Sequence, residues 1–248
     1  MIRAVVKAPF EAAESLRAQF VELAPEGFEE LETGDGVELA AYGEAAQRVV
    51  AAFPDAHVEQ VDDGWEDRWR EFHRPVRIGQ LWVGPPWLPP PADAIAVVID
   101  PGGAFGTGAH PTTRLCLELL LEQPPGSVVD VGCGSGVLAI AAALLGHAPV
   151  HALDSAEAAV EASRQNATVN GVALATELSD ATESTLPSTD LALANIALAA
   201  VELLDSTLWS ARLIASGYLV ADRPELPGFR HVERRELDGW AADLFEQR

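Results

Sequence analysis

The segment of residues 128–136 has the residue types and the spacing of a nucleotide-binding turn. An apolar run, Val128–Val131, leads into three glycines at alternate positions, and the helical pattern Val137–Leu145 follows. These glycines are Gly132, Gly134 and Gly136. Glycine lets the backbone approach a ligand closely, and a helix start offers unpaired N–H groups. The segment therefore predicts a buried strand, a tight turn and a helix that together cradle a nucleotide.

The spacing of the glycines distinguishes between nucleotide cofactors. A dinucleotide fingerprint, Gly-x-Gly-x-x-Gly, needs glycine at position 137, where this chain has Val137. Here the pattern is Gly-x-Gly-x-Gly, and the acid Asp130 precedes it by two positions. This combination indicates S-adenosylmethionine as the cofactor.

Two acids follow the next predicted strands. Asp154 lies 18 residues beyond Gly136, where a carboxylate can accept both ribose hydroxyls. It could instead be a helix N-cap, for which Ser155 is an equal candidate. Asp180 follows the next strand and could bind the adenine amino group or be a solvated loop acid. Turn and acid together favour nucleotide binding.

Asn195 is the candidate catalytic residue because it ends a predicted strand where a reacting group would lie. Its amide can accept a hydrogen bond from an amine or hold the methionine end of the cofactor, although asparagine also forms turns. Ile196 and Ala197 follow it. The pattern Asn-Pro-Pro-aromatic is typical of enzymes that methylate planar amides or adenine, so its absence favours an aliphatic amine.

The loop before the glycine turn, Pro101–Arg114, concentrates glycine, hydroxyl and aromatic residues. Phe105 could cover a cofactor and Thr113 could bond its polar end. His110 could act as a base, but it precedes a proline and no carboxylate partner is evident, which favours a loop hydrogen bond. The candidate cofactor contacts in this loop are Phe105, Gly106, Thr107 and Thr113.

Strands that alternate with helices predict a doubly wound, Rossmann-like α/β domain over residues 74–248, with its ligand outside the carboxyl ends of the parallel strands. The expected strands are Ile95–Ile99, Val128–Val131, Val150–Asp154, Ala173–Leu178, Leu191–Asn195 and Tyr218–Ala221. The expected helices are Pro111–Glu122, Val137–Leu145, Ala156–Asn170 and Val201–Leu208. Arg74–Trp87 should add two short strands, and Phe229–Leu237 with Trp240–Phe245 could form a closing antiparallel hairpin.

Residues 1–62 predict a small ferredoxin-like α+β domain of the order β-α-β-β-α-β. It holds 4 Lys/Arg and 13 Asp/Glu, a net charge of −9. Residues 63–73 are expected to form a linker helix, with Trp65 and Trp69 as a packing seam at i, i+4. Residues 74–248 would then be the methyltransferase domain.

The amino-acid composition limits the kinds of molecule that the protein is expected to bind. The net charge of −22 argues against direct nucleic acid binding but permits a basic protein partner, and it could equally reflect a proteome-wide bias. Cys116 and Cys133 are expected to be buried packing residues, so no metal site is predicted. No apolar run reaches the ~18 residues of a membrane helix. We expect a soluble, cytoplasmic monomer with no membrane contact.

The chain resembles the ribosomal protein methyltransferases of the PrmA type. The Gly-Thr-Gly-x-His-x-Thr-Thr core of the loop is specific to this group, whereas the glycine turn is common to many methyltransferases. The resemblance covers nearly the whole length and rests on Trp65–Trp69, Pro75–Gly79, Pro101–Arg114, Asp130–Ala141 and Ala194–Ile196. Two departures are Asp222–Gly228, which stands where the family usually has a helix, and a glycine-rich stretch reduced to Ser216-Gly217.

This resemblance implies the function. The family transfers methyl groups from S-adenosylmethionine to lysine and N-terminal amines of the stalk-base protein of the large ribosomal subunit. Cofactor contacts carry over to Thr113, Gly132, Asp154 and Asn195, with Phe105 closing over the cofactor, and the N-terminal domain would recognise the substrate. The alternatives are a methyltransferase of another protein or of a small molecule, and a regulatory module that binds the cofactor without turnover.

Overall fold

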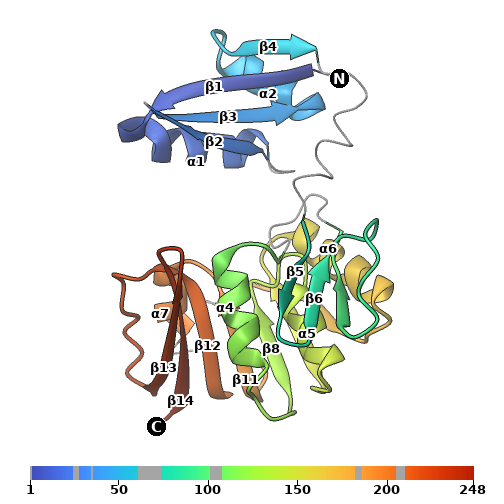
Figure 1. Cartoon of the computed structure of the whole chain (residues 1–248). Helices are drawn as coiled ribbons and strands as arrows, with labels where there is room; N and C mark the ends of the chain where they lie inside the picture. Colours follow the sequence, from blue (N-terminus) through green and yellow to red (C-terminus); the bar gives the residue numbers. More distant parts are fainter. Residues whose placement is uncertain are drawn as a thin grey trace. The chain divides into compact units, whose positions relative to one another are not determined.

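The chain divides into two compact units, Met1–Phe72 and His73–Arg248 (Figure 1). The computed structural model describes residues 2–24, 28–34, 36–60, 74–100, 108–181, 186–204 and 210–248. The predicted linker helix, residues 63–73, lies outside them. Within the described part of the chain, no helix is both long and apolar enough to cross a membrane.

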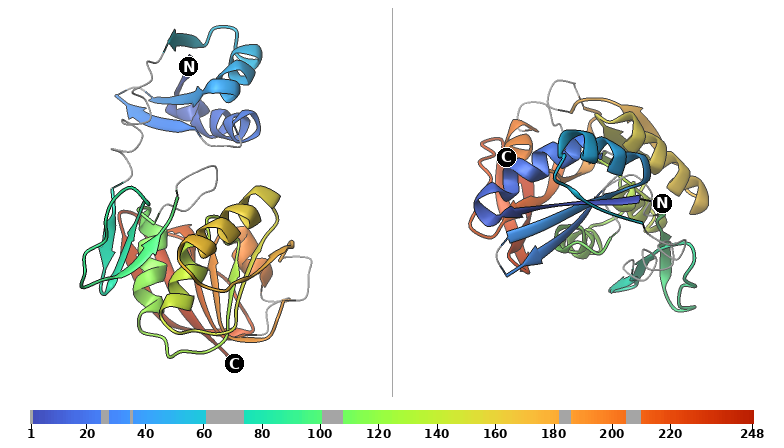
Figure 2. Two further views of the ribbon diagram at one scale, coloured as in Figure 1. Left: turned by 90° about the vertical axis from the view of Figure 1, so that its right-hand side faces the viewer. Right: turned by 90° about the horizontal axis from the view of Figure 1, so that it is seen from above.

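The N-terminal unit is a four-stranded antiparallel sheet in the order β2-β3-β1-β4, with both helices packed on one face (Figure 2). Apolar residues such as Phe20, Leu39 and Val49 are buried between helices and sheet. The element order is the one predicted from the sequence. Its elements are β1 (Ile2–Pro9), α1 (Ala13–Leu23), β2 (Glu29–Thr33), β3 (Gly36–Tyr42), α2 (Gly43–Ala52) and β4 (His57–Gln60).

The second unit is built on a seven-stranded sheet in the order β10-β9-β8-β11-β12-β14-β13. The first five strands are parallel, and chain order reverses between β8 and β11. In an open α/β sheet, that reversal opens the crevice in which ligands bind. The five strands are β8 (Val128–Val131), β9 (Val150–Asp154), β10 (Ala175–Leu178), β11 (Thr189–Asn195) and β12 (Ser210–Leu219).

Helices cover both faces of this sheet, which confirms the predicted doubly wound domain. One core cluster lies between the sheet and α4 and α5, and a second lies on the opposite face with α7. Cys116 and Cys133 are both buried with free thiols, as expected. The helices are α4 (Pro111–Leu120), α5 (Val137–Leu144), α6 (Glu157–Val169) and α7 (Leu198–Leu203).

The predicted strand at Ile95–Ile99 forms, but outside the large sheet. As β7 (Ile95–Val98) it pairs in parallel with β6 (Leu81–Gly84), which is antiparallel to β5 (Val76–Ile78). The side chain of Asn170, the residue that follows α6, bonds both the N–H and the carbonyl of Val98, at 2.8 and 2.6 Å. These two bonds use backbone groups of Val98 that a further strand would otherwise bond. β7 is therefore an edge strand of a separate three-stranded sheet.

The strand predicted at Tyr218–Ala221 is longer and begins earlier. It starts at Ser210 and passes through Ser216-Gly217 as a bulge, where Gly217 has φ +103°. Glycine adopts that φ readily, so this pair bends a continuous strand and does not end it. The helix predicted at Val201–Leu208 likewise starts earlier, at Leu198.

The C-terminal hairpin forms as predicted. β13 (Phe229–Leu237) and β14 (Trp240–Gln247) are antiparallel, and β14 pairs with β12 (Figure 1). Asp238 and Gly239 make the turn with positive φ of 50° and 83°. The connection of residues 220–228 contains no helix, as its sequence indicated.

Candidate active site

The glycine turn closes against the end of the neighbouring strand. The N–H groups of Gly132 and Cys133 both donate to the Leu153 carbonyl at 2.9 Å. Gly132 has φ +69°, and a Cβ there would lie 2.3 Å from Cγ2 of Ile196. The protein itself therefore requires glycine at this position, whether or not a ligand approaches it. Even a methyl group at this position would collide with Ile196, the residue that follows Asn195.

Asp154 is held by two backbone groups at the end of β9. Its Oδ2 accepts from the Gly134 N–H at 3.0 Å, and its Oδ1 accepts from the Ala156 N–H at 2.9 Å. The second bond forms a turn before α6, whose N-cap is Ala156 without a side-chain capping bond, so neither Asp154 nor Ser155 is the N-cap that the sequence allowed. A carboxylate oxygen has further acceptor capacity, which suits two ribose hydroxyls.

Asp130 lies beneath the turn and is almost completely buried, at 1% exposure. Its Oδ2 accepts from the Ala139 N–H at 3.1 Å, while Oδ1 has no hydrogen-bond partner among the residues that the structure describes. Burial raises the pKa of this carboxyl to about 7. An unsatisfied buried acceptor beside a turn of positive-φ glycines fits S-adenosylmethionine, whose amino group supplies donors.

Asn195 and Thr113 come together across 82 residues of chain. The Asn195 Nδ2 donates to the Thr113 Oγ1 at 3.3 Å, and Thr113 is fully buried in the first turn of α4. The next residue, Ile196, donates its N–H to the Ser216 carbonyl at 3.0 Å. Because Asn195 donates from Nδ2 to Thr113, its Oδ1 remains as an acceptor at the carboxyl edge of the sheet.

His110 is the N-cap of α4. Its Nδ1 lies 2.8 Å from Thr112 Oγ1 and accepts from the Thr112 N–H at 3.4 Å. Burial lowers the pKa of this imidazole, which favours the neutral ring at neutral pH. The contacts support the interpretation of His110 as a structural hydrogen-bonding residue.

Two residues at this edge carry no obvious signal in the sequence. The Trp240 ring, at the start of β14, meets the His110 ring edge-on with centroids 4.9 Å apart. Asn166 on α6 accepts from the Asp100 N–H at 3.1 Å and donates to the Ser135 carbonyl at 2.9 Å. It thereby ties the start of the Pro101–Arg114 loop to the glycine turn.

The structure brings most of the predicted site residues to one edge of the sheet. The glycines, Asp154, Asn195 and Thr113 lie around the ends of β8, β9 and β11. Asp180 is exposed after β10, whose next residue, Ser179, donates its N–H to the Asp154 carbonyl at 2.9 Å. The remaining candidates, Phe105, Gly106 and Thr107, lie outside the described residues.

Comparison with known proteins agrees with this geometry. Residues 30–242 match the family model described as "Ribosomal protein L11 methyltransferase (PrmA)". A ribosomal protein L11 methyltransferase of Legionella pneumophila (strain Lens) is 37% identical over 221 residues, 81% of this chain and 75% of that protein. One from Aliivibrio fischeri (strain MJ11) is 41% identical over 195 residues, 73% of this chain and 65% of that protein.

A solved structure is also similar to this chain. The ribosomal protein L11 methylase of Lactobacillus delbrueckii subsp. bulgaricus superposes with a TM-score of 0.62 at 27% identity, covering 71% of this chain and 99% of the other. The family model spans most of the chain, and the relatives are well above 30% identical. This chain is a methyltransferase and belongs to the ribosomal protein L11 methyltransferase (PrmA) family.

Proposed function

We propose that this protein uses S-adenosylmethionine to methylate lysine and N-terminal amines of ribosomal protein L11 in the cytoplasm. The observation that carries the proposal is the Asn195–Thr113 hydrogen bond beside the glycine turn. It places an amide acceptor at the point where the chain order of the sheet reverses. The names of the relatives supply the substrate.

When bound, S-adenosylmethionine supplies an electrophilic methyl group. The chain's own contribution is to hold and orient the amine. Asn195 Oδ1 would accept a hydrogen bond from the amine N–H, which would hold the nitrogen with its lone pair directed away from the amide. Orientation of this kind can supply roughly 7–11 kcal/mol of the barrier.

The amine must be neutral before it reacts. A lysine has a pKa near ~10.4 and is mostly charged at neutral pH. Desolvation lowers the pKa of an amine. An amine bonded to Asn195, which is half-buried beside the fully buried Thr113, would lose part of its hydration. His110, with Nδ1 engaged by Thr112, is not proposed as a base.

We propose that the N-terminal unit recognises the substrate by charge. Residues 1–62 carry a net charge of −9, and the side chains of Glu44 and Asp55 are exposed. A surface of this sign attracts a basic protein and increases the rate of encounter. S-adenosylmethionine is small and binds in the other unit, so its affinity should not depend on these acids.

The test of the reaction uses the purified protein, S-adenosylmethionine labelled on its methyl group, and ribosomes from a strain that lacks this gene. We expect label on protein L11, mapped by mass spectrometry to lysine and N-terminal amines. Label on another protein would disprove the substrate, and binding of the cofactor without any transfer would disprove the reaction.

The test of recognition is a charge reversal. Glu44→Lys with Asp55→Lys should raise KM for the protein substrate while leaving the Kd for the cofactor unchanged. The matched control reverses two exposed acids of the other unit, Glu177→Lys with Glu225→Lys. An equal rise in KM for both pairs would show a general charge effect and would contradict recognition by the N-terminal unit.

A further inference from the structure

We infer that Tyr218 and Asp243, on the C-terminal strands, are positioning residues for methyl transfer. They hold the bulge at Gly217 against which the Asn195–Ile196 turn packs. The inference rests on the proposed function for its catalytic consequence. Its structural part can be tested without any substrate.

The first step is the contact between Ile196 and Gly217. A Cβ at Gly217 would lie 2.1 Å from the Ile196 carbonyl oxygen and 2.7 Å from its carbonyl carbon. The backbone after Asn195 therefore lies directly against the backbone of β12. On its other side, the Ile196 side chain fills the space at Gly132. Ile196 is held between the glycine turn and the bulge, so its position fixes that of Asn195.

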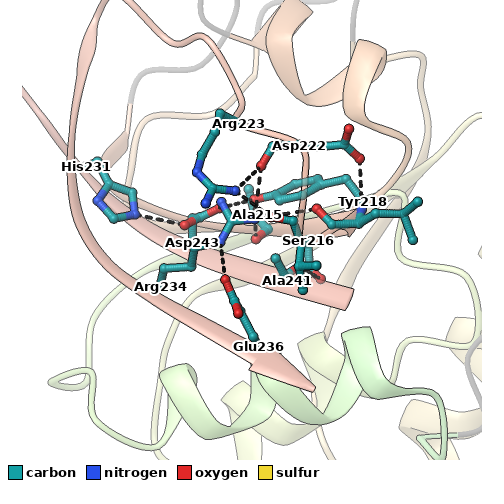
Figure 3. A network of polar contacts seen from close by, with 12 residues as sticks. Ala215, Ser216, Tyr218, Asp222, Arg223, His231, Arg234, Glu236, Ala241 and Asp243 are labelled. Atoms are coloured by element: carbon teal, nitrogen blue, oxygen red, sulfur yellow. Dashed lines mark hydrogen bonds and ion pairs between the residues drawn. The ribbon is translucent and has the colours of Figure 1, made fainter. Parts of the chain in front are cut away.

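The second step is the set of bonds that fixes the bulge. The register of β12 against β14 shifts between Ser216 and Tyr218. Ser216 Oγ donates to the Ala241 carbonyl at 2.7 Å. The Tyr218 hydroxyl lies 2.9 Å from both the Ala215 carbonyl and Asp243 Oδ2 (Figure 3). The side chains of both residues that flank Gly217 are thus bonded, that of Ser216 to β14 and that of Tyr218 to β14 and to β12 itself.

The third step is the anchoring of Asp243, which is completely buried. His231 Nε2 lies 2.8 Å from its Oδ1, and Arg234 donates to its Oδ2 at 3.3 Å (Figure 3). Arg234 also donates to the carbonyls of Val220 and Asp222, at 3.1 and 2.9 Å. A buried carboxylate with these donors is fixed in place and gives Tyr218 a rigid acceptor.

The same bonds could serve stability alone, so the test needs a matched control. Ser210 lies on β12 too, nearer its amino end, and its buried hydroxyl is 2.7 Å from Thr189 Oγ1 on β11. Tyr218→Phe and Ser210→Ala each remove one buried hydroxyl from the same strand. Only the first lies beside the bulge.

Kinetics give the first comparison. Misplacement of a reacting group by about 1 Å can lower a rate by about 100-fold, so a smaller displacement in Tyr218→Phe should lower kcat by about 10-fold. Ser210→Ala should keep the kcat of the unchanged protein while losing thermal stability. If Tyr218→Phe keeps its kcat with a lowered Tm, Tyr218 serves stability only and the inference is overturned.

Asparagine labelling gives a comparison that needs no substrate. The chain has three asparagines, at 166, 170 and 195, so a protein labelled with 15N in asparagine side chains shows three amide groups. Asn195→Ala identifies the signal of Asn195. Tyr218→Phe should shift that signal and leave unchanged those of Asn166, on α6, and Asn170, directly after α6. Ser210→Ala should shift none of them.

A second variant keeps the inference testable if Tyr218→Phe folds poorly. Gly217→Ala places a methyl group against the Ile196 carbonyl at a φ of +103°, and it should shift the same Asn195 signal and lower kcat. An unmoved Asn195 signal in both variants would overturn the inference. If the signal moves in these variants but the unchanged protein does not methylate protein L11, the proposed substrate is wrong and the positioning role stands.

Discussion

The side-chain amide of Asn195 donates to the Thr113 hydroxyl at 3.3 Å, which joins the end of β11 to the first turn of α4. The two residues come from segments separated by the glycine turn. Their bond fixes the rotation of the Asn195 amide, so that Nδ2 faces the protein and Oδ1 remains to receive a donor.

Thr113→Val removes the acceptor of that bond and keeps the volume of the side chain. An unmade buried hydrogen bond costs about 1–3 kcal/mol, so kcat/KM should fall by about 10- to 100-fold. The control is Thr189→Val, which also removes a buried threonine hydroxyl, from the opposite end of β11. Steady-state methylation assays should show the loss for Thr113→Val and not for the control.

Asp154→Asn should weaken cofactor binding. An amide there loses one oxygen acceptor, so one of the backbone donors at Gly134 and Ala156 faces an N–H group. Hydrogen bonds to charged groups contribute about 1.5–3 kcal/mol, and the Kd for S-adenosylmethionine should rise by about 10- to 100-fold. Titration calorimetry measures it. Asp190→Asn, whose carboxylate accepts from Ser127 at the other end of the sheet, should leave this Kd unchanged.

Asp130 makes stability depend on pH. Its pKa is raised by burial from 3.8 to about 7, so between these values the folded protein keeps a proton that the unfolded chain has released. The free energy of unfolding should therefore fall as pH rises from 4 to 7, and stay lower above 7. Denaturant titrations should show a flatter profile for Asp130→Asn. An equal slope in both proteins would contradict the assignment.

His110→Asn tests whether the histidine acts as a base. Asparagine is a good N-cap, so α4 should still begin normally. We expect kcat within about three-fold of the unchanged protein, because the change replaces one N-cap by another and removes no catalytic group. The pH–rate profile should keep its shape between pH 5 and 7. Loss of an ionisation from that profile would show that the imidazole takes the proton.

Trp240→Leu should impair the protein substrate and spare the cofactor. The ring packs against His110 at the same edge of the sheet as Asn195. An aromatic face there can attract an amine cation. We expect a higher KM for protein L11 and an unchanged Kd for S-adenosylmethionine. A parallel loss of cofactor affinity would instead place Trp240 in the cofactor site.

Much of the fold could be predicted from local patterns. The spacing of apolar residues and glycines predicts a strand at Val128–Val131, a turn after it and then a helix. These patterns depend on interactions within about ten residues of chain. The same holds for the hairpin of β13 and β14 and for the order of the N-terminal elements. Asn195 could be predicted as a site residue because it ends such a strand.

The sequence by itself determined where most of the strands, turns and helices form and which cofactor the glycine spacing suits, because these depend on neighbours in the chain. Only the tertiary structure decided which strands pair beyond the C-terminal hairpin. It placed β7 beside β6, and it made Ser216-Gly217 a bulge under Ile196. It also buried Asp243 among donors from distant positions. Hydrophobicity shows that a residue is buried, but close packing between distant segments selects what it contacts.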